Sequence, residues 1–218
     1  MTDYETQRAR LVDSLEKRLF ERDERVFRAL RKVPRHLFTP TTLWSLAYED
    51  RALPIGDCQT ISAPHMVAIM TSLLRVQPHH KVLEVGTGSG YQAAVLAELA
   101  AEVYTIERVP DLAERAAATL SELGINNVCV VVGDGCLGYP EAAPYDRIIV
   151  TAAGADVPRS LIDQLASPGR LLMPVGSHYE QELVALDKSD DVLRRSYHGL
   201  CYFVPLIGEG AWNPPQER

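Results

Sequence analysis

The chain has 218 residues, of which 46% are hydrophobic and 23% are charged; this usage is typical of a globular protein and excludes a wholly disordered chain. Its length predicts a single domain. The 29 acidic and 22 basic residues give a net charge of −7, and so acidic a chain lacks the basic surface that non-specific binding to nucleic acid or to an anionic membrane requires.

The N-terminal part of the chain is predicted to be mainly helical. Residues 3–33 form the first expected helix, because leucines recur every fourth residue in its first half and Pro34 ends the pattern. Residues 34–64 are rich in proline and are predicted to be irregular, and such long irregular stretches are often functional. A second helix is expected over 64–75, with Ser62 as its N-cap.

Short apolar strands alternate with amphipathic helices from residue 81 on, which predicts a parallel sheet with right-handed crossovers. Residues 182–207 alternate in three segments and predict antiparallel strands. We therefore expect an α/β fold, a doubly wound and mostly parallel sheet with an antiparallel C-terminal edge and an N-terminal helical extension. The expected strands are 81–85, 102–106, 128–132, 145–150 and 170–175, and the expected helices are 91–100, 110–123 and 158–166.

The expected organisation is one domain with three parts. Residues 1–75 hold the N-terminal helices and an active-site loop, residues 80–176 the ligand-binding core, and residues 177–218 the C-terminal strands. The first residues contain no apolar signal-peptide core, and no apolar run approaches the roughly 20 residues that span a bilayer. We expect a cytoplasmic monomer.

The cysteines and histidines do not predict a metal site. The cysteines show no CxxC spacing, so neither a thiolate zinc site nor a disulfide framework is expected, and a reducing compartment is indicated. The histidines other than His65 show no ligand spacing. The cysteines are Cys58, Cys129, Cys136 and Cys201.

A glycine-rich loop, Gly86–Gly90, stands between a predicted strand and a predicted helix. Such a loop lies at the carboxyl end of a parallel sheet and lets a ligand approach the backbone closely. Glu107 follows Gly86 by 21 residues, at the end of the next strand, where an acid can accept hydrogen bonds from ribose hydroxyls. The pattern therefore predicts an adenosine-containing ligand.

Charge distinguishes the possible ligands. Glu84 lies two residues before the first glycine and Gly86–Gly90 holds no Lys or Arg, so the pyrophosphate of NAD would be repelled. The glycines are also spaced GxGxG rather than GxGxxG. S-adenosylmethionine, which has an ammonium, a sulfonium and no phosphate, is therefore favoured over NAD. Asp134 follows the next strand and could accept a hydrogen bond from the adenine amino group.

Each of these residues also has a simpler interpretation. The glycines could form a turn needed only for packing, Glu107 could be an exposed acid at a strand end, and Asp134 could be an ordinary turn aspartate. The combination of all three at strand ends indicates a ligand site more strongly than any one of them.

The sequence resembles the protein-L-isoaspartate (D-aspartate) O-methyltransferase family from about Val33 to Trp212. QTISAPHM, and VTAA followed later by FVPL, are quite specific to that family, whereas the glycine loop is shared by many methyltransferases. The segments that carry the resemblance are VPRHLF (33–38), AYEDRALPIG (47–56), QTISAPHMVA (59–68), VLEVGTGSGY (82–91), GDG (133–135), YDRIIVTAA (145–153), PRSLIDQL (158–165), GRLLMPVG (169–176) and FVPLIGEGAW (203–212).

The resemblance implies a Rossmann-like class I S-adenosylmethionine-dependent methyltransferase that repairs damaged proteins. It would methylate the α-carboxylate of an isoaspartyl residue, and the methyl ester would then close to a succinimide that reopens partly as aspartate. A carboxylate is already ionised at pH 7, so the reaction needs neither a general base nor a metal. Holding the carboxylate oxygen in line with the methyl carbon can supply much of the acceleration.

The resemblance also implies roles for individual residues. Ser62 would be catalytic, with its hydroxyl between cofactor and substrate carboxylate, and this role does not exclude helix capping. The substrate would contact Thr151, Ala152, Ala153 and Val204, although these could serve only packing. The cofactor would contact Thr60, Ile61, Ala63, His65, Glu84, Gly86, Thr87, Gly88, Gly90, Glu107, Arg108, Asp134 and Gly135, of which His65 could instead be an exposed helix residue.

The chain departs from the family pattern just before Gln59. The family usually carries an aromatic residue or histidine followed by glycine there, whereas this chain has Asp57 and Cys58. Loss of the glycine should stiffen the loop, Asp57 adds negative charge where a carboxylate must dock, and Cys58 could be sensitive to oxidation.

Three alternatives remain beside a general repair enzyme. The chain could be a related methyltransferase that modifies aspartate in one dedicated peptide. It could be a non-catalytic adaptor that binds isoaspartyl proteins and uses the cofactor structurally. It could be an NAD oxidoreductase, which Glu84 disfavours.

Overall fold

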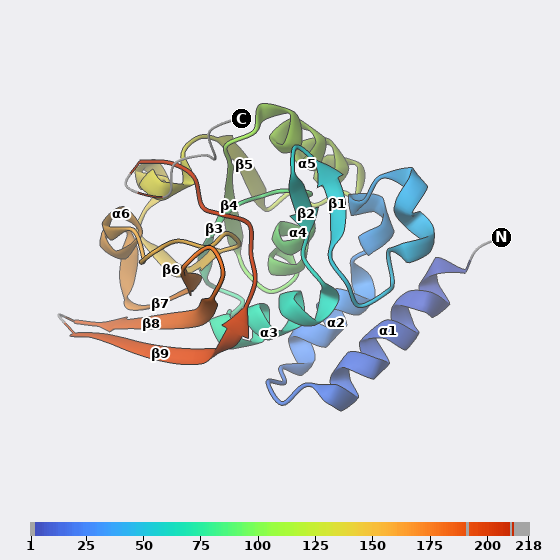
Figure 1. The fold of residues 1–218 in the computed structure, drawn as a ribbon, viewed down its shortest axis with the longest axis horizontal. Coiled ribbons are helices and arrows are strands. Elements are labelled where there is room, and N and C mark those ends of the chain that lie inside the picture. Colours follow the sequence, from blue (N-terminus) through green and yellow to red (C-terminus); the bar gives the residue numbers. More distant parts are fainter. Residues whose placement is uncertain (1–2, 191, 210, 212–218) are drawn as a thin grey trace.

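A seven-stranded sheet in the order β5-β4-β3-β6-β7-β8-β9 forms the centre of the computed structural model, which describes residues 3–190, 192–209 and 211 (Figure 1). The first five strands in this order are parallel, and β8 and β9 are antiparallel, as predicted. Gly210 and Trp212 of the last family segment lie outside the described residues. The strands are β3 (Lys81–Val85), β4 (Glu102–Glu107), β5 (Val128–Val132), β6 (Tyr145–Val150), β7 (Leu165–Gly176), β8 (Gln181–Ser189) and β9 (Val192–Cys201).

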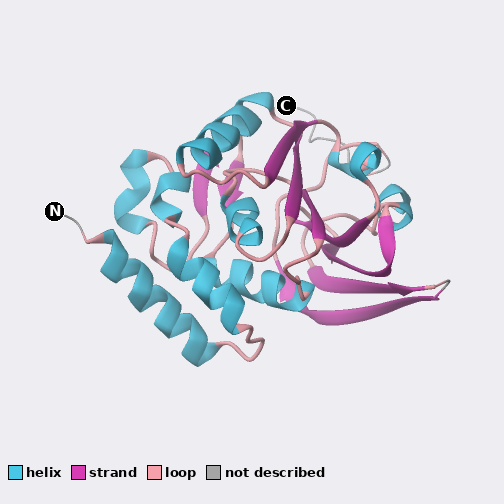
Figure 2. Cartoon of the chain, turned by 180° about the vertical axis from the view of Figure 1, so that it is seen from behind, coloured by secondary structure: helices cyan, strands magenta, loops and turns pink. Residues whose placement is uncertain are grey.

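Helices cover both faces of this sheet. Successive strand residues face opposite sides, so that Val82 joins the larger apolar cluster, with α1 to α5, and Leu83 the smaller one, with α6. Figure 2 shows α1 at one end of the molecule and the β8–β9 hairpin at the other. The helices are α1 (Tyr4–Arg18), α2 (Glu24–Lys32), α3 (Pro64–Leu74), α4 (Tyr91–Ala97), α5 (Pro110–Glu122) and α6 (Arg159–Asp163).

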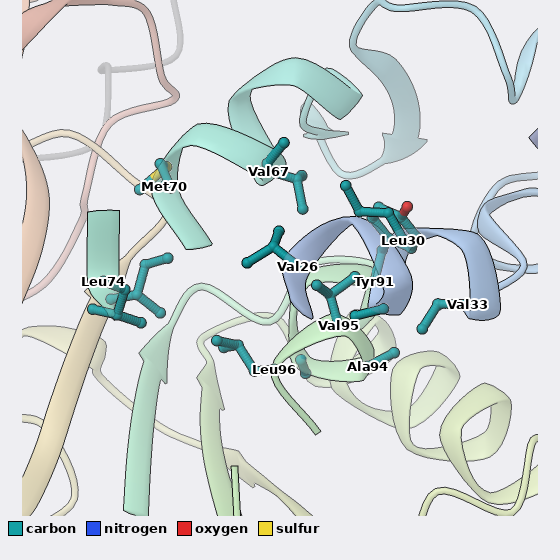
Figure 3. Close-up of a cluster of buried hydrophobic side chains, with 14 of the residues drawn as sticks. Val26, Leu30, Val33, Val67, Met70, Leu74, Tyr91, Ala94, Val95 and Leu96 are labelled. Atoms are coloured by element: carbon teal, nitrogen blue, oxygen red, sulfur yellow. The ribbon is translucent and has the colours of Figure 1, made fainter. Parts of the chain in front are cut away.

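The predicted single helix over 3–33 is wrong, because the chain forms two helices there. The backbone at Leu19 turns to an extended conformation, and the Asp23 carboxylate then accepts a hydrogen bond from the backbone N–H of Arg25 and starts α2. The break lets both helices contribute to one core, in which Val26 and Leu30 of α2 lie beside α3 and α4 (Figure 3).

The stretch over 34–64 is more regular than predicted. It holds two short 3-10 helices, at Arg35–Phe38 and Thr41–Leu46, and an antiparallel hairpin of β1 (Leu53–Gly56) and β2 (Gln59–Ile61). The turn residues of the hairpin are Asp57 and Cys58, both with positive φ, of 52° and 55°. Such turns favour Asn-Gly, so the sequence lacked the usual signal for a hairpin.

One buried arginine organises the residues that precede the hairpin. The Arg35 side chain is fully buried and donates hydrogen bonds to the carbonyl oxygens of Ala47, at 2.9 Å, and Arg51, at 3.2 Å. Its guanidinium lies 5.1 Å from the ring centroid of Tyr91 on α4. Burial lowers the pKa of Arg35 to about 10, which leaves the side chain charged at neutral pH.

The residues after β9 do not form the third antiparallel strand expected from the alternation over 182–207. Within the described part of this segment, Pro205 makes an isolated parallel bridge with Ala153. The backbone N–H of Ala153 donates to Val204 O and that of Leu206 donates to Ala153 O, so this segment lies across the carboxyl end of β6. No helix within the described part of the chain is long and apolar enough to cross a membrane.

Candidate active site

Two cavities meet at the carboxyl ends of the parallel strands and share Thr60, Gly86, Gly88 and Thr151 in their walls. Of the other residues predicted to bind cofactor or substrate, the first cavity is lined by Glu107, Arg108, Gly135, Ala152 and Val204, and the second by Ile61, Ser62 and Thr87.

The first turn of the glycine loop is set by a close approach to β6. Gly86 has φ 97°, a conformation that favours glycine. The Thr151 hydroxyl donates to Gly86 O at 2.7 Å, and a Cβ on Gly86 would lie 2.5 Å from the same hydroxyl oxygen. Thr151 therefore holds the glycine loop in place, which is one form of the packing role that the sequence left open for it.

Glu107 is a buried acid at the end of β4, not an exposed one. Its side chain accepts hydrogen bonds from the backbone N–H groups of Gly88, at 2.9 Å, and Val109, at 3.0 Å. The residue is 6% exposed and lines the first cavity. Each carboxylate oxygen keeps a second lone pair, so the fixed carboxylate can still accept hydrogen bonds from a ligand.

Glu84 lies beneath the loop rather than in a cavity. Its side chain is 0% exposed, and its Oε2 accepts a hydrogen bond from the Thr105 hydroxyl at 2.6 Å. The Thr105 hydroxyl in turn lies 2.6 Å from the Thr87 hydroxyl. Burial raises the pKa of Glu84 to about 8. Glu84 therefore lines neither cavity, and the predicted attraction between an ionised Glu84 and a cationic ligand finds no support in this geometry.

The Asp134 carboxylate holds two turns of the backbone. It accepts hydrogen bonds from the backbone N–H groups of Cys136, at 2.8 Å, and Glu209, at 2.7 Å. A Cβ on Gly208 would lie 1.9 Å from its Oδ1, so the C-terminal segment closes tightly over the carboxylate. Asp134 is not in the wall of either cavity, whereas its neighbour Gly135 is.

The predicted N-cap role of Ser62 is wrong. The N-cap of α3 is Ala63, whose methyl side chain cannot cap a helix. The carboxylate of Asp50 caps the helix instead, because its Oδ1 accepts a hydrogen bond from the backbone N–H of His65. The same oxygen lies 2.9 Å from the His65 ring Nδ1. His65 and Ala63 therefore lie outside both cavity walls, whereas Ser62 lines the second cavity.

Two further predicted residues act through the backbone. Gly90 begins α4 with φ 86°, and a Cβ there would lie 3.2 Å from the Ala116 Cβ. Ala153 is fully buried and holds the C-terminal segment through its backbone. Neither is in a cavity wall, so direct contact of Gly90 with cofactor and of Ala153 with substrate finds no support in the geometry.

The cavity walls also include residues, most of them apolar, that sequence reasoning missed. The signal was available for some of them, since Ile106 immediately precedes Glu107 and Tyr91 and Gln92 immediately follow the loop. The missed residues of the first cavity are Gln59, Val85, Ile106, Pro205, Leu206 and Ile207, and those of the second are Val67, Met70, Ser89, Tyr91 and Gln92.

The unusual turn of the hairpin is tied to α5. Asp57 Oδ2 lies 3.3 Å from Arg115 Nη2, so the extra negative charge is paired with an arginine on the exposed surface. Cys58 is exposed. Ile55 of β1 lies against the glycine loop, since a Cβ on Gly88 would be 3.5 Å from its Cδ1.

Comparison with known proteins gives consistent matches over almost the whole chain. A family model described as protein-L-isoaspartate(D-aspartate) O-methyltransferase (PCMT) matches residues 6–211. A protein-L-isoaspartate O-methyltransferase of Methanoculleus marisnigri is 55% identical over 190 residues, or 87% of this chain and 86% of that protein. One of Methanopyrus kandleri is 53% identical over 214 residues, or 96% and 95%.

Solved structures agree with this match. A protein-L-isoaspartate O-methyltransferase with 30% identity has a TM-score of 0.83 and covers 92% of this chain, which spans 66% of that one. A structure titled as a putative enzyme of the same name from Plasmodium falciparum, in complex with S-adenosyl-L-homocysteine, has a TM-score of 0.80 at 24% identity and covers 95% of this chain and 99% of its own. This second likeness shows the fold.

Replacing Gly86 with alanine should weaken ligand binding. The left-handed conformation costs about 1–2 kcal/mol for alanine, and the new methyl group would collide with Thr151. We expect Gly86→Ala to lower the affinity for S-adenosylmethionine by about tenfold or more, measured by calorimetry. Gly124→Ala is the matched control, since Gly124 has φ 69° but nothing within 4 Å of a Cβ. Equal affinities for both variants would contradict the role of the close approach.

Glu84 should make stability fall as pH rises. Its pKa is about 8 in the folded protein against 4.5 for an unperturbed carboxyl, so the folded state holds a proton that the unfolded chain releases. The stabilisation is complete below pH 4.5 and is lost as pH rises through 8. The difference in unfolding free energy between wild type and Glu84→Gln, from urea denaturation, should therefore fall between about pH 5 and 9. A flat or rising difference would mean that Glu84 is ionised in the folded protein.

Proposed function

Because the chain belongs to the protein-L-isoaspartate(D-aspartate) O-methyltransferase family, we propose that it transfers a methyl group from S-adenosylmethionine to the α-carboxylate of L-isoaspartyl residues in damaged proteins. The observation that carries this proposal is the family match over residues 6–211 together with the cavities at the carboxyl ends of β3, β4 and β6.

The first cavity suits an adenosyl group. Glu107, fixed by two backbone donors, stands where ribose hydroxyls can donate to it. Ile106, Leu206 and Ile207 supply apolar walls for a flat aromatic base. When bound, S-adenosylmethionine supplies the methyl group from its sulfonium. The carboxylate oxygen takes this methyl group, and S-adenosylhomocysteine is the leaving group.

The second cavity suits the carboxylate that accepts the methyl group. Ser62 lines it, and its hydroxyl can donate a hydrogen bond to a carboxylate oxygen and hold that oxygen in place. Thr151 and Gly86 belong to both cavities, so cofactor and substrate sites meet at these residues. The acceptor carboxylate is ionised at pH 7, so the protein's task is to orient it and to exclude water.

Ala152 and Val204 also line the first cavity, so in this proposal the peptide main chain lies in the part of that cavity beside these two residues, where the small side chain of Ala152 leaves room for it. The resulting methyl ester can close to a succinimide by attack of the following backbone nitrogen, with loss of methanol. Hydrolysis of the succinimide then regenerates some normal aspartate, so part of the damaged isoaspartyl residue is repaired.

We further propose that the chain acts as a monomer in the cytoplasm. Its four cysteines are free, which fits a reducing compartment. The relatives described above carry the general enzyme name, so neither a dedicated peptide modifier nor a non-catalytic adaptor is favoured.

The reaction should distinguish isoaspartate from aspartate. We expect transfer of a labelled methyl group from S-adenosylmethionine to a peptide with one L-isoaspartyl residue, and none above background to the same peptide with L-aspartate. A D-aspartyl peptide forms a third arm that tests the breadth of the site. Transfer to neither of the first two, despite cofactor binding, would favour an adaptor.

Ser62 should matter for turnover and not for stability. A hydrogen bond to a charged group is worth about 1.5–3 kcal/mol, so Ser62→Ala should lower kcat by about 10- to 100-fold. Because Ser62 does not cap α3, the unfolding free energy should change by less than about 0.5 kcal/mol. Ser121→Ala, on the exposed side of α5, is the control for an innocuous serine substitution. Unchanged turnover in Ser62→Ala would exclude a catalytic hydroxyl.

A further inference from the structure

The start of α3 is held by a residue far from it in the sequence. Ala63, the N-cap, makes no side-chain hydrogen bond, so the first turn of the helix needs an acceptor from elsewhere. Asp50 supplies it, since its Oδ1 accepts from the backbone N–H of His65 at 2.9 Å and contacts the His65 ring Nδ1 at the same distance.

Asp50 is itself held in place from two sides. Its Oδ2 accepts a hydrogen bond from Arg18 Nη2 of α1 at 2.8 Å, and its side chain is only 20% exposed. The backbone around it is fixed by Arg35, which donates to the carbonyl oxygens of Ala47 and Arg51. Asp50 therefore offers an acceptor at a well-defined position.

The segment that joins β2 to α3 is very short. β2 ends at Ile61 and α3 begins at Pro64, which leaves Ser62 and Ala63 between them. Ile61 is fixed at one end, because it is buried and pairs with Leu53 of β1. His65 is fixed at the other end by Asp50. The position of Ser62 in the second cavity thus depends on both anchors.

We propose that Asp50 is a positioning residue for the methyl transfer, which acts by fixing the start of α3 and thereby the place of the Ser62 hydroxyl. This inference rests on the proposed function of Ser62. Asp50 touches neither cavity, so its effect passes through His65 and the backbone of residues 62–64.

Three substitutions of Asp50 separate geometry from charge. Asp50→Ala removes the acceptor, and Asp50→Glu keeps the charge but moves the oxygens by one methylene. Asp50→Asn keeps an oxygen at the same place. Because small misplacements of a reacting group are costly, we expect kcat to fall about tenfold or more for Ala and several-fold for Glu, and Asn to retain most of it. The Kd for S-adenosylmethionine should stay within about twofold.

The matched control is Asp23→Ala. Asp23 also accepts a hydrogen bond from a backbone N–H at a helix start, that of Arg25, and also pairs with an arginine, but it lies at the start of α2 and in neither cavity wall. The Asp23→Ala variant should have a lower melting temperature, because a helix cap is lost, and an unchanged kcat. An equal loss of kcat in the Asp23 and Asp50 variants would overturn the proposal. If Asp50→Ala does not fold, Asp50→Glu decides, and full kcat in that variant would also overturn it.

A double-mutant cycle with Ser62→Ala tests the route. If Asp50 acts through Ser62, Asp50→Ala should slow the Ser62→Ala enzyme no further. Additive losses would overturn the proposal while leaving the methyl transfer intact. Failure of the proposed function looks different, since the wild type would then transfer no methyl group to the isoaspartyl peptide.

Discussion

The close approach of the Gly86 turn to Thr151 is the constraint on which the site depends. Any side chain at residue 86 would force this turn or Thr151 to shift, because even a Cβ would lie 2.5 Å from the threonine hydroxyl oxygen. The approach joins the ends of β3 and β6 and places both residues where the two cavities meet.

The acids around this turn divide into two kinds. Glu107 is fixed by two backbone donors and lines the first cavity. Glu84 lies under the turn, bonded to Thr105, and is mostly protonated at neutral pH because burial raises its pKa to about 8. The structure gives no contact between Glu84 and a cavity, so the assignment of a cationic donor rather than NAD rests on family membership.

Most of the core over residues 81–176 could be predicted because its signals are local, with short apolar runs ended by glycines and helices between them. The helix expected over 158–166 is wrong at its end, since α6 ends at Asp163 and β7 already begins at Leu165. The break between α1 and α2, at Leu19–Asp23, was missed because the apolar pattern of a helix continues through it. The Asp23 cap, which starts a new helix, is a weaker signal in the sequence than that pattern. The cap of α3 was wrongly given to Ser62 because a nearby serine is visible in the sequence, whereas Asp50, 15 residues before His65, is brought there only by the fold. Burial of Glu84 is likewise a tertiary effect.

Calorimetry of the purified chain with S-adenosylmethionine and, separately, with NAD⁺ tests this view of the site most directly. The geometry around Glu107 and the family match predict saturable binding of S-adenosylmethionine, with one molecule bound per chain, and no measurable heat of binding with NAD⁺. Saturable binding of NAD⁺ by a chain that does not bind S-adenosylmethionine would contradict it.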